Sequence, residues 1–283
     1  MREISFSITE KDNNKTIKLF LREFGISSSL MTKLKNTENG ITKNGEFAKT
    51  IDVLRFGDTL KIKIENSGHM PSPAEMDIEI CYEDEDIIVL NKPPLLPVHE
   101  SRNHIGDTLS NFVSYHLGEC EDTSFRAVYR LDRDTSGLVL CAKHELAASK
   151  LAGRIKKDYY AVVEGEIKEG KTISLPIARC GDSIIKRRVD ESGESAITHF
   201  EPISIKNGNT LLKINLETGR THQIRVHFSH IGYPLLGDSM YGGNCDLIQR
   251  QALHCKTIYF THPITQENMI ITCDFPDDFK KLI

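Results

Sequence analysis

The segment Tyr129–Lys143 constrains this chain more than any other. It reads Y-R-L-D-R-D-T-S-G-L-V-L-C-A-K, and the seven residues Arg130–Ser136 hold two carboxylates, two guanidiniums and two hydroxyls. The apolar run Leu138–Ala142 follows Gly137 directly, a pattern typical of a buried strand. We therefore expect Asp132 to lie on a loop that the core holds still and that reaches solvent. In an arbitrary loop, the same side chains would form only a surface network of Arg and Asp.

The size and composition of the chain indicate a folded protein with two domains. Its 283 residues are enough for one large domain and one small one, with a core that needs no disulfides. The hydrophobic and charged fractions are those of ordinary globular proteins, which excludes general disorder. No apolar run approaches the ~20 residues of a membrane span, and the N-terminus lacks a signal-peptide pattern. We expect a cytoplasmic, monomeric protein with no membrane partner.

Neither the cysteines nor the histidines form a familiar metal-binding pattern. The seven cysteines contain no C-x-x-C pair and are odd in number, which argues against a zinc module and a disulfide framework. His222, His227 and His230 have the spacing H-x4-H-x2-H, which is not a common ligand spacing. We expect reduced cysteines and no metal.

The net charge of −4 argues against a simple nucleic-acid binder, so the distribution of charge matters. Residues 77–122 hold 2 basic and 11 acidic side chains. Residues 1–65 hold 12 basic and 9 acidic side chains, and residues 123–227 hold 18 and 13. The two mildly basic regions have surfaces that could follow a phosphate backbone.

The first 65 residues predict two helices and a small hairpin. Apolar residues recur with helical spacing between positions 15 and 24. Ser27 is the expected N-cap of a second, short helix. Asn44-Gly45 is the dipeptide best suited to a tight hairpin turn. Gly57-Asp58 then leads into Thr59–Ile64, whose alternation is typical of a half-buried strand.

Residues 66–76 separate this region from the rest of the chain. They contain Ser, Gly and two Pro without any apolar period, so they predict a linker that lets a small domain, 1–65, move relative to a large one, 77–283. Periodicity in the large domain predicts strands at 87–90, 138–142, 159–165 and 211–216, and helices that begin at Thr108, span His144–Lys157 and follow an N-cap at Thr221.

Two charged segments of the large domain have open interpretations. The acidic segment Glu83–Asp86 is better explained as a solvated turn than as a metal site. Lys186-Arg187-Arg188 lies in polar sequence that predicts a mobile hairpin facing solvent or RNA.

Three motifs carry a resemblance to a known family. Arg130–Gly137 resembles the catalytic signature H-R-L-D-x-x-T-S-G of the RluA-type pseudouridine synthases, with Asp132 in the place of the catalytic aspartate and Tyr129 where the family usually has His. Thr218–His227 resembles the hallmark T-G-R-T-H-Q-I-R-V-H without a gap. Lys157–Gly165 is similar to K-x-Y-x-A-x-V-x-G. Further landmarks follow in order as G-D-x-x-Y-G, R-Q-A-L-H and H-P.

A fourth landmark is only partly present. The family's N-K-P-x-G-x-x-V-H-P resembles Asn91–Glu100, but Leu95 replaces the Gly and Glu100 replaces the final Pro. Because Leu resists positive φ, we expect the turn at Leu95 to adopt a different backbone.

The first 65 residues resemble the S4 RNA-binding domain. The resemblance rests on Leu21-Arg22, Ile26-Ser27, Leu30–Leu34, Asn44-Gly45 and Gly57-Asp58. The insertion-like segment Asn36–Asn39 departs from the usual short basic loop. The alternative for this region is a helical cap with solvated lysines.

The resemblance implies an α+β fold with a mixed, largely antiparallel sheet, flanking helices and a central RNA-binding cleft, preceded by a small S4-like domain. It implies an isomerase that converts uridine to pseudouridine in RNA without a cofactor. Large-subunit (23S) ribosomal RNA is the favoured substrate, and transfer RNA is possible. The target nucleotide must be extruded from its stack to be reached.

The resemblance also implies the roles of individual residues. Asp132 acts at the sugar as nucleophile or base, which the sequence leaves open. Arg225 keeps Asp132 ionised, in an expected bidentate pair that fixes its direction. Tyr159 stacks on the uracil and relays the C5 proton. Arg130 fills the vacated stack. The other expected substrate or RNA contacts are Arg133, Thr135, Arg220, His222, Lys92, Lys18, Arg22 and Lys33. For Lys92, a structural role is the open alternative.

Two other functions were weighed. A glycosidase would need a second acid in a matching context, and Asp134 is too close to Asp132 and aimed alike. A ribosome-assembly or RNA-binding factor without catalysis would not need Asp132, Tyr159 and Arg225 together.

Overall fold

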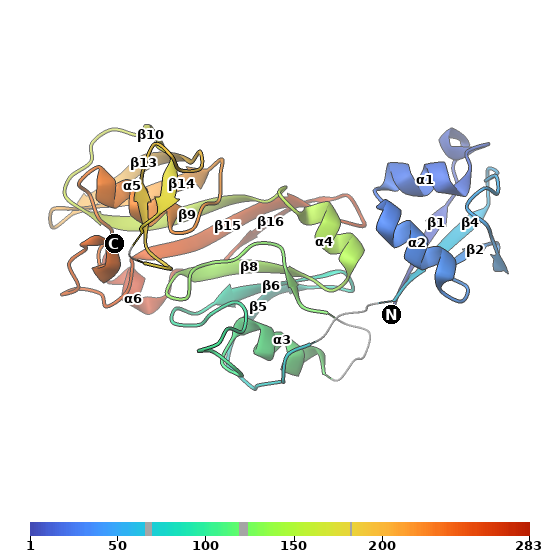
Figure 1. Cartoon of the computed structure of the whole chain (residues 1–283), viewed down its shortest axis with the longest axis horizontal. Coiled ribbons are helices and arrows are strands. Elements are labelled where there is room, and N and C mark those ends of the chain that lie inside the picture. The colour runs from blue at the N-terminus through green and yellow to red at the C-terminus, as the bar shows by residue number, and fades with distance from the viewer. Residues whose placement is uncertain (66–69, 119–123, 182) are drawn as a thin grey trace.

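A computed structural model describes residues 1–65, 70–118, 124–181 and 183–283 of the chain. Figure 1 shows a small N-terminal unit beside a larger part that is built on a long sheet with short helices around it. Within the described ranges, no helix is long and apolar enough to cross a membrane.

The N-terminal unit packs two helices against a four-stranded sheet of order β1-β4-β2-β3. Ser27 caps the second helix by accepting a hydrogen bond from the Leu30 amide at 3.1 Å. Asn44 and Gly45 have φ of 53° and 87°, as a tight hairpin requires. The expected helices and hairpin are therefore confirmed. The elements are β1 Arg2–Ser7, η1 Glu10–Asp12, α1 Ile17–Phe24, α2 Ser28–Asn36, β2 Ile41–Lys43, β3 Glu46–Phe47 and β4 Thr59–Ile64.

The large domain is built on a sheet whose main path is β10-β13-β14-β9-β15-β8-β6-β5, with β16 and β7 paired to β15 and β8. The β15·β8 pair is parallel and the other pairs of this sheet in the described chain are antiparallel, so the predicted mixed, largely antiparallel sheet is confirmed. The strands are β5 Glu79–Glu83, β6 Ile87–Lys92, β7 Arg126–Ala127, β8 Ser136–Ala142, β9 Lys156–Glu164, β10 Lys171–Ser174, β13 Ile197–Lys206, β14 Asn209–Leu216, β15 Leu253–Thr261 and β16 Asn268–Thr272.

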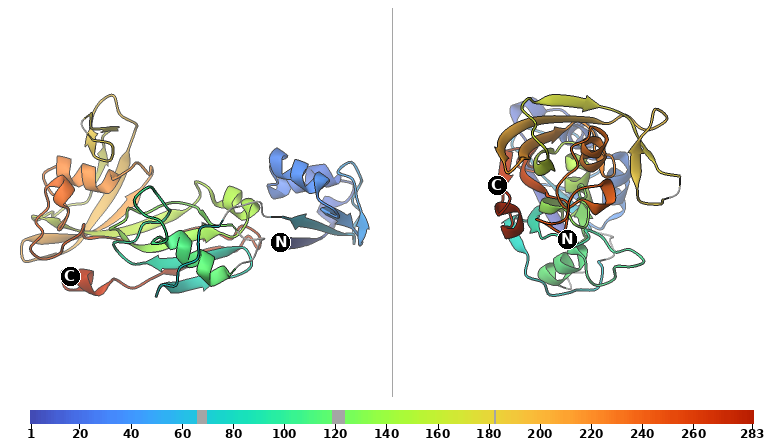
Figure 2. Two further views of the ribbon diagram at one scale, coloured as in Figure 1. Left: turned by 60° about the horizontal axis from the view of Figure 1, so that its bottom comes forward. Right: turned by 90° about the vertical axis from the view of Figure 1, so that its left-hand side faces the viewer.

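Short helices and one hairpin complete the domain. The hairpin of β11 and β12 projects from the body of the large sheet in both views of Figure 2. These elements are α3 Leu109–Leu117, β11 Ile177–Arg179, β12 Arg187–Val189, α4 Glu145–Leu151, α5 Gln223–His230, η2 Ser239–Tyr241 and α6 Asp277–Lys280.

Gly137 explains how the Asp132 loop joins the core. A Cβ at this position would lie 2.2 Å from the backbone oxygen of Cys255 on β15, and φ is +113°. Only glycine allows β8 and β15 to approach so closely in parallel. Every residue of β8 is buried, as the apolar run predicted, and the loop that carries Asp132 enters the sheet there.

The N-terminal unit contacts the large domain through α4. The side chain of Leu146 is fully buried among the apolar residues of the N-terminal unit. The ammonium of Lys150 lies 3.4 Å from the centre of the Phe24 ring, and Lys33 pairs with Glu145. The predicted motion of the small domain stays a prediction. Positions 66–69 of the expected linker lie outside the described residues, and Pro71 and Ser72 accept hydrogen bonds from Ser114 and Asn111 of α3.

Three local predictions were wrong. The helix expected at His144–Lys157 ends at Leu151, because Gly153 takes a φ of +71° and β9 begins at Lys156. His222, not Thr221, precedes the first turn of α5. Leu95 adopts the positive φ that we expected it to avoid, at 64°.

The acidic segment is only partly the solvated turn that we expected, since Glu83 and Glu85 are exposed but Asp86 is not. Asp86 is buried, and its Oδ1 accepts hydrogen bonds from Arg2 at 2.7 Å and His144 at 2.9 Å. Asp84 accepts from the backbone amides of Asp86 and Ile87. The segment is also a hydrogen-bonded junction that the N-terminal strand β1 joins through Arg2.

Candidate active site

A small cavity of about 90 Å³ lies where the Asp132 loop, β9 and the start of α5 meet. The residues that line it come from distant parts of the chain. They become neighbours because of the order of the strands in the sheet. The lining residues are Arg130, Leu131, Asp132, Thr135, Tyr159, Leu216, Gly219, Arg220, His222, Gln223, Ile224, Arg225 and Leu253.

Arg225 links two carboxylates at the base of this cavity. Its Nη1 donates to Oδ2 of Asp132 at 3.1 Å. Its Nε and Nη2 donate to the two oxygens of Asp238 at 2.7 and 2.9 Å. The expected pair with Asp132 is therefore present but rests on a single hydrogen bond, and the bidentate partner of Arg225 is Asp238.

The charges of Asp132, Arg225 and Asp238 stabilise one another. Burial lowers the pKa of Arg225, but Asp238 and then Asp132 outweigh burial, so that pKa is raised overall. The side chain of Asp238 is 1% exposed, whereas that of Asp132 is 22% exposed. Asp238 thus fixes the orientation of Arg225. The remaining edge of the guanidinium faces Asp132, whose carboxylate still reaches the cavity.

Backbone carbonyls of the loop that carries Asp132 accept hydrogen bonds from buried groups. Arg250 donates from Nη1 to the carbonyl of Asp134 at 3.2 Å, and the amide of Thr135 donates to the carbonyl of Asp132 at 3.1 Å. Lys92 donates to the carbonyl of Arg133 at 2.9 Å. The loop is therefore rigid where Asp132 leaves it, as a catalytic carboxylate requires.

Lys92 is not an RNA contact. The residue is fully buried, and its ammonium donates to the carbonyls of Pro93, Leu96 and Arg133, each at 2.9 Å. Desolvation lowers the pKa of Lys92 to about 7. The sequence could not distinguish a surface cation from this buried donor, because a lysine after a strand fits both.

His222 faces Asp132 from a strained backbone position. Its φ of 58° is in the left-handed region, and its Nε2 lies 3.8 Å from Oδ2 of Asp132. Its Nδ1 shares a hydrogen bond of 2.9 Å with the hydroxyl of Tyr241. Burial lowers the pKa of His222, which favours the neutral ring. His222 lines the cavity, and its contact with the substrate stays a prediction.

Tyr159 lines the cavity with a ring that is 6% exposed. Its hydroxyl interacts with the thiol of Cys255, behind the cavity. Burial raises the pKa of Tyr159 well above its usual value, which keeps the phenol neutral. The stacking of this ring on uracil stays a prediction. The relay of a proton by the hydroxyl stays a prediction.

The other predicted contact residues differ in whether their guanidinium groups are already paired with groups of the protein. Arg130 is exposed and lines the cavity. Arg220 also lines it, but its guanidinium pairs with Glu194 and donates to the carbonyl of Ser195 at 3.1 Å. Arg133 pairs with Asp134 at 2.6 Å. Arg130 is therefore the most available guanidinium at this cavity.

Two predicted contacts serve the protein itself. Thr135 is 2% exposed, and its hydroxyl accepts a hydrogen bond from Gln251 at 3.2 Å. Lys33 pairs with Glu145 of the large domain, and its contact with RNA stays a prediction. Lys18 and Arg22 are exposed on α1.

Asp238, Tyr241 and Arg250 were missed as members of the site. Each belongs to a landmark that the sequence shows, G-D-x-x-Y-G or R-Q-A-L-H, but the pattern gives no partner for any of them. A buried acid and a buried arginine in one chain are a signal, since each needs a counter-charge.

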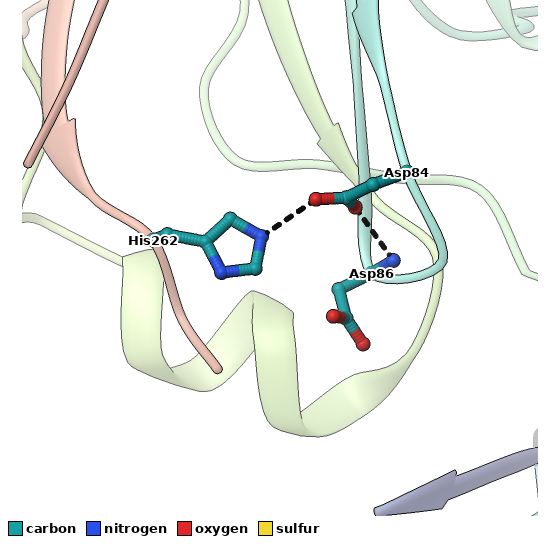
Figure 3. Close-up of side chains that lie close together, drawn as sticks. All are labelled: Asp84, Asp86 and His262. Atoms are coloured by element: carbon teal, nitrogen blue, oxygen red, sulfur yellow. Dashed lines mark hydrogen bonds and ion pairs between the residues drawn. The ribbon is translucent and has the colours of Figure 1, made fainter. Parts of the chain in front are cut away.

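One group of side chains outside the cavity has metal-ligand chemistry. In the described ranges, Asp84, Asp86 and His262 offer ligand atoms within 4.8 Å of one another. Figure 3 shows Nε2 of His262 bonded to Asp84, at 2.8 Å. Because Asp86 is already engaged by Arg2 and His144, the donor atoms serve hydrogen bonds and not an open coordination site.

Comparison with known proteins decides the family. The family model for RNA pseudouridylate synthase matches residues 86–230, which contain Asp132, Tyr159 and Arg225. The chain is 41% identical over 280 residues to the "Uncharacterized RNA pseudouridine synthase YjbO" of Bacillus subtilis, and the match covers 95% of this chain and 98% of that protein. This chain belongs to the RNA pseudouridylate synthase family. It is therefore an RNA uridine isomerase.

Other RNA pseudouridylate synthases are similar in sequence or structure. The chain is 36% identical to "Ribosomal large subunit pseudouridine synthase D" of Pseudomonas aeruginosa, over 86% of this chain and 82% of that protein. The structure matches human RNA pseudouridylate synthase domain containing 1 with a TM-score of 0.59 and 25% identity, over 71% of this chain and 84% of the other. A second human structure, domain containing 4, has a TM-score of 0.58 at 21% identity, covering 71% of this chain and 90% of its own, and supports the fold alone.

Proposed function

We propose that this synthase converts specific uridines of large-subunit ribosomal RNA to pseudouridine, with Asp132 as the reacting carboxylate. The contact of Asp132 with Arg225 at 3.1 Å, between two residues of the matched family region, carries the proposal. Relatives named ribosomal large subunit pseudouridine synthase D, at 36% and 37% identity, favour ribosomal RNA as the substrate.

The reaction requires a carboxylate at the sugar. The C1′–N1 bond breaks, the uracil rotates, and a bond from C5 to C1′ forms while the C5 proton leaves and N1 gains a proton. Asp132 acts either as the nucleophile at C1′ or as a base toward a sugar proton. Arg225 supports both roles, because a nearby cation favours the charged carboxylate.

The target uridine enters the cavity only after extrusion from its stack. Extrusion costs a few kcal/mol, less for an unpaired base. Tyr159 offers a face for the uracil, and Arg130 is exposed at the same cavity, where its planar head can replace the lost stacking.

We also propose that residues 1–65 form an S4-like RNA-binding domain. Lys18 and Arg22 are exposed on α1, form no ion pair among the described residues, and are available to phosphates. Changing both to Glu should weaken RNA binding about tenfold or more while leaving turnover of bound RNA unchanged. A double variant with wild-type affinity would contradict the assignment.

Mapping pseudouridines in a gene-deletion strain tests the function. We expect one or more positions of large-subunit RNA to lose modification and to regain it when the wild-type gene is supplied, but not when Asp132→Asn is supplied. Unchanged modification of all cellular RNA in the deletion strain would overturn the proposal. Restoration of growth without modification by Asp132→Asn would instead assign a separate binding role to the protein.

A further inference from the structure

A second cavity adjoins the first at the same cleft. Its volume is about 380 Å³, and it shares Arg130, Tyr159, Leu216 and Gly219 with the smaller cavity. The remaining lining residues are Val128, Tyr129, Gly153, Ile155, Lys157, Glu217 and Thr218. A nucleotide held in the first cavity therefore has this space directly beside it.

Lys157 is the distinctive side chain of the second cavity. It is partly buried, and its ammonium lies 4.3 Å from the centre of the Tyr129 ring. Among the described residues, no carboxylate or carbonyl is paired with this ammonium by a hydrogen bond or salt bridge. The carboxylate of Glu217, which also lines the cavity, is instead hydrogen-bonded to His199.

The placement of Lys157 leaves its charge for a ligand. A buried cation normally has a counter-ion, because desolvation without one is costly. Burial accordingly lowers the pKa of Lys157. An aromatic face offsets only part of that cost. A phosphate is a strong partner for a compact ammonium at such a position, and Arg130 at the shared wall adds a second positive charge.

We propose that the second cavity binds the nucleotide next to the target uridine and that Lys157 holds its phosphate. This inference rests on the proposed function and adds a positioning residue to it. The phosphate contact fixes the backbone on one side of the extruded nucleotide, so that the sugar meets Asp132 in a defined orientation. Lys157 precedes Tyr159 by two residues on β9, so both side chains point to the same face of the sheet.

Lys157→Met tests the contact, with Lys156→Met as its matched control. Lys156 is the exposed neighbour on β9 and carries the same charge on the opposite face of the strand. The probe is unmodified large-subunit ribosomal RNA made by transcription in vitro. Affinity is measured over a range of salt concentrations, together with kcat, KM and the thermal unfolding midpoint.

We expect Lys157→Met to raise Kd and KM about tenfold and to lower kcat about tenfold, because the sugar loses part of its orientation toward Asp132. The slope of log affinity against log salt should fall by about 0.7–1, the value for one lost phosphate contact. Lys156→Met should change neither slope nor KM, and Lys157→Arg should restore the slope. A Lys157→Met protein that loses affinity or stability with an unchanged slope would overturn the proposal, since a purely structural lysine would behave in this way.

Replacing one phosphate of the RNA by an uncharged methylphosphonate gives the decisive measurement once the target uridine is mapped. One methylphosphonate is placed at each linkage flanking the target in a short RNA. Wild-type affinity should fall at one linkage, and Lys157→Met should lose nothing further there. Additive losses at every linkage would overturn the contact. Wild-type protein that forms no pseudouridine would instead contradict the proposed function, so the two failures are distinguishable.

Discussion

The guanidinium of Arg225 lies 3.1 Å from the carboxylate of Asp132, although the two residues are 93 positions apart. One edge of the guanidinium is occupied by Asp238, which accepts two hydrogen bonds and is almost fully buried. Arg225 therefore serves two carboxylates with different exposure. Substitutions at this arginine should affect folding through Asp238 and catalysis through Asp132.

Arg225→Met should lower kcat at least about a hundredfold, because Asp132 loses the cation that favours its charged form. RNA affinity should change less than about threefold. The free energy of unfolding should fall by about 3–5 kcal/mol, since Asp238 is left buried and unpaired. Single-turnover kinetics and urea unfolding measure the two effects separately.

A double variant separates the two effects at Arg225. Arg225→Met with Asp238→Asn removes the unpaired buried charge, so part of the lost stability should return while turnover stays low. Recovery of turnover in the double variant would show that Arg225 acts through folding alone.

Asp238→Asn should lower kcat about tenfold without changing KM. The amide keeps the shape of the side chain but weakens the pair of hydrogen bonds that orients Arg225 toward Asp132. Asp246→Asn, a change on the exposed surface, is the control and should be neutral. A rise in KM with kcat unchanged would argue that Asp238 affects RNA binding.

Local patterns predicted the parts of this fold that depend on nearby residues. The Ser27 cap, the Asn44-Gly45 hairpin and the buried strand after Gly137 require only short-range geometry and hydrophobic period. The end of α4 was missed, because pairing of β9 with β14 and β15 overrides the helical spacing that continues to Lys157. Tertiary pairing of this kind leaves no signal in a single sequence.

The candidate site likewise has features that the sequence predicted and features that depend on tertiary packing. Motifs placed Asp132, Tyr159 and Arg225 around one cavity, as expected from the resemblance. They gave no means to see that Asp238 takes the bidentate contact, or that Lys92 points inward, since both depend on which charges become buried together. Partners of charged residues are decided by three-dimensional packing, and composition cannot predict them.

Lys92→Met should destabilise the protein by about 2 kcal/mol or more, because three carbonyls lose their shared donor. Turnover should fall as the loop carrying Asp132 loosens. The salt dependence of RNA affinity should not change, because the buried ammonium reaches no phosphate. Lys168→Met, at an exposed position, is the control. A smaller slope of log affinity against log salt concentration for Lys92→Met would show that this residue contacts RNA.

Leu95→Gly should stabilise the protein slightly, by about 0.5 kcal/mol. Leu95 is 65% exposed and has a φ of 64°, a conformation that costs an L-residue about 1–2 kcal/mol. Glycine relieves this strain but gains freedom in the unfolded chain, which offsets about 0.4–1 kcal/mol. Leu247→Gly changes a similarly exposed leucine whose φ is not positive, and it should destabilise. Urea unfolding of both variants would reveal whether the turn is strained.

Asp86 should make the stability of the junction between the two domains depend on acid pH. Burial raises the pKa of Asp86, but the hydrogen bonds from His144 and Arg2 outweigh it and lower that pKa to about 2. Since an unfolded Asp titrates near about 4, the native state stabilises the carboxylate by an amount on the order of 2 kcal/mol that is fully present above about pH 5. That contribution is lost as pH falls from about 4 to about 2.

The test compares urea unfolding of the wild type and Asp86→Asn between pH 7 and pH 3. The wild type should be more stable by a constant margin down to about pH 5. The margin should shrink below about pH 4, because the Asp86 carboxyl is then protonated in the unfolded chain but still ionised in the native protein. Asp246→Asn, an exposed change of the same kind, should show no such pH-dependent margin. A margin that stays constant to pH 3 would mean that Asp86 contributes through shape, and that Arg2 and His144 do not act on its charge.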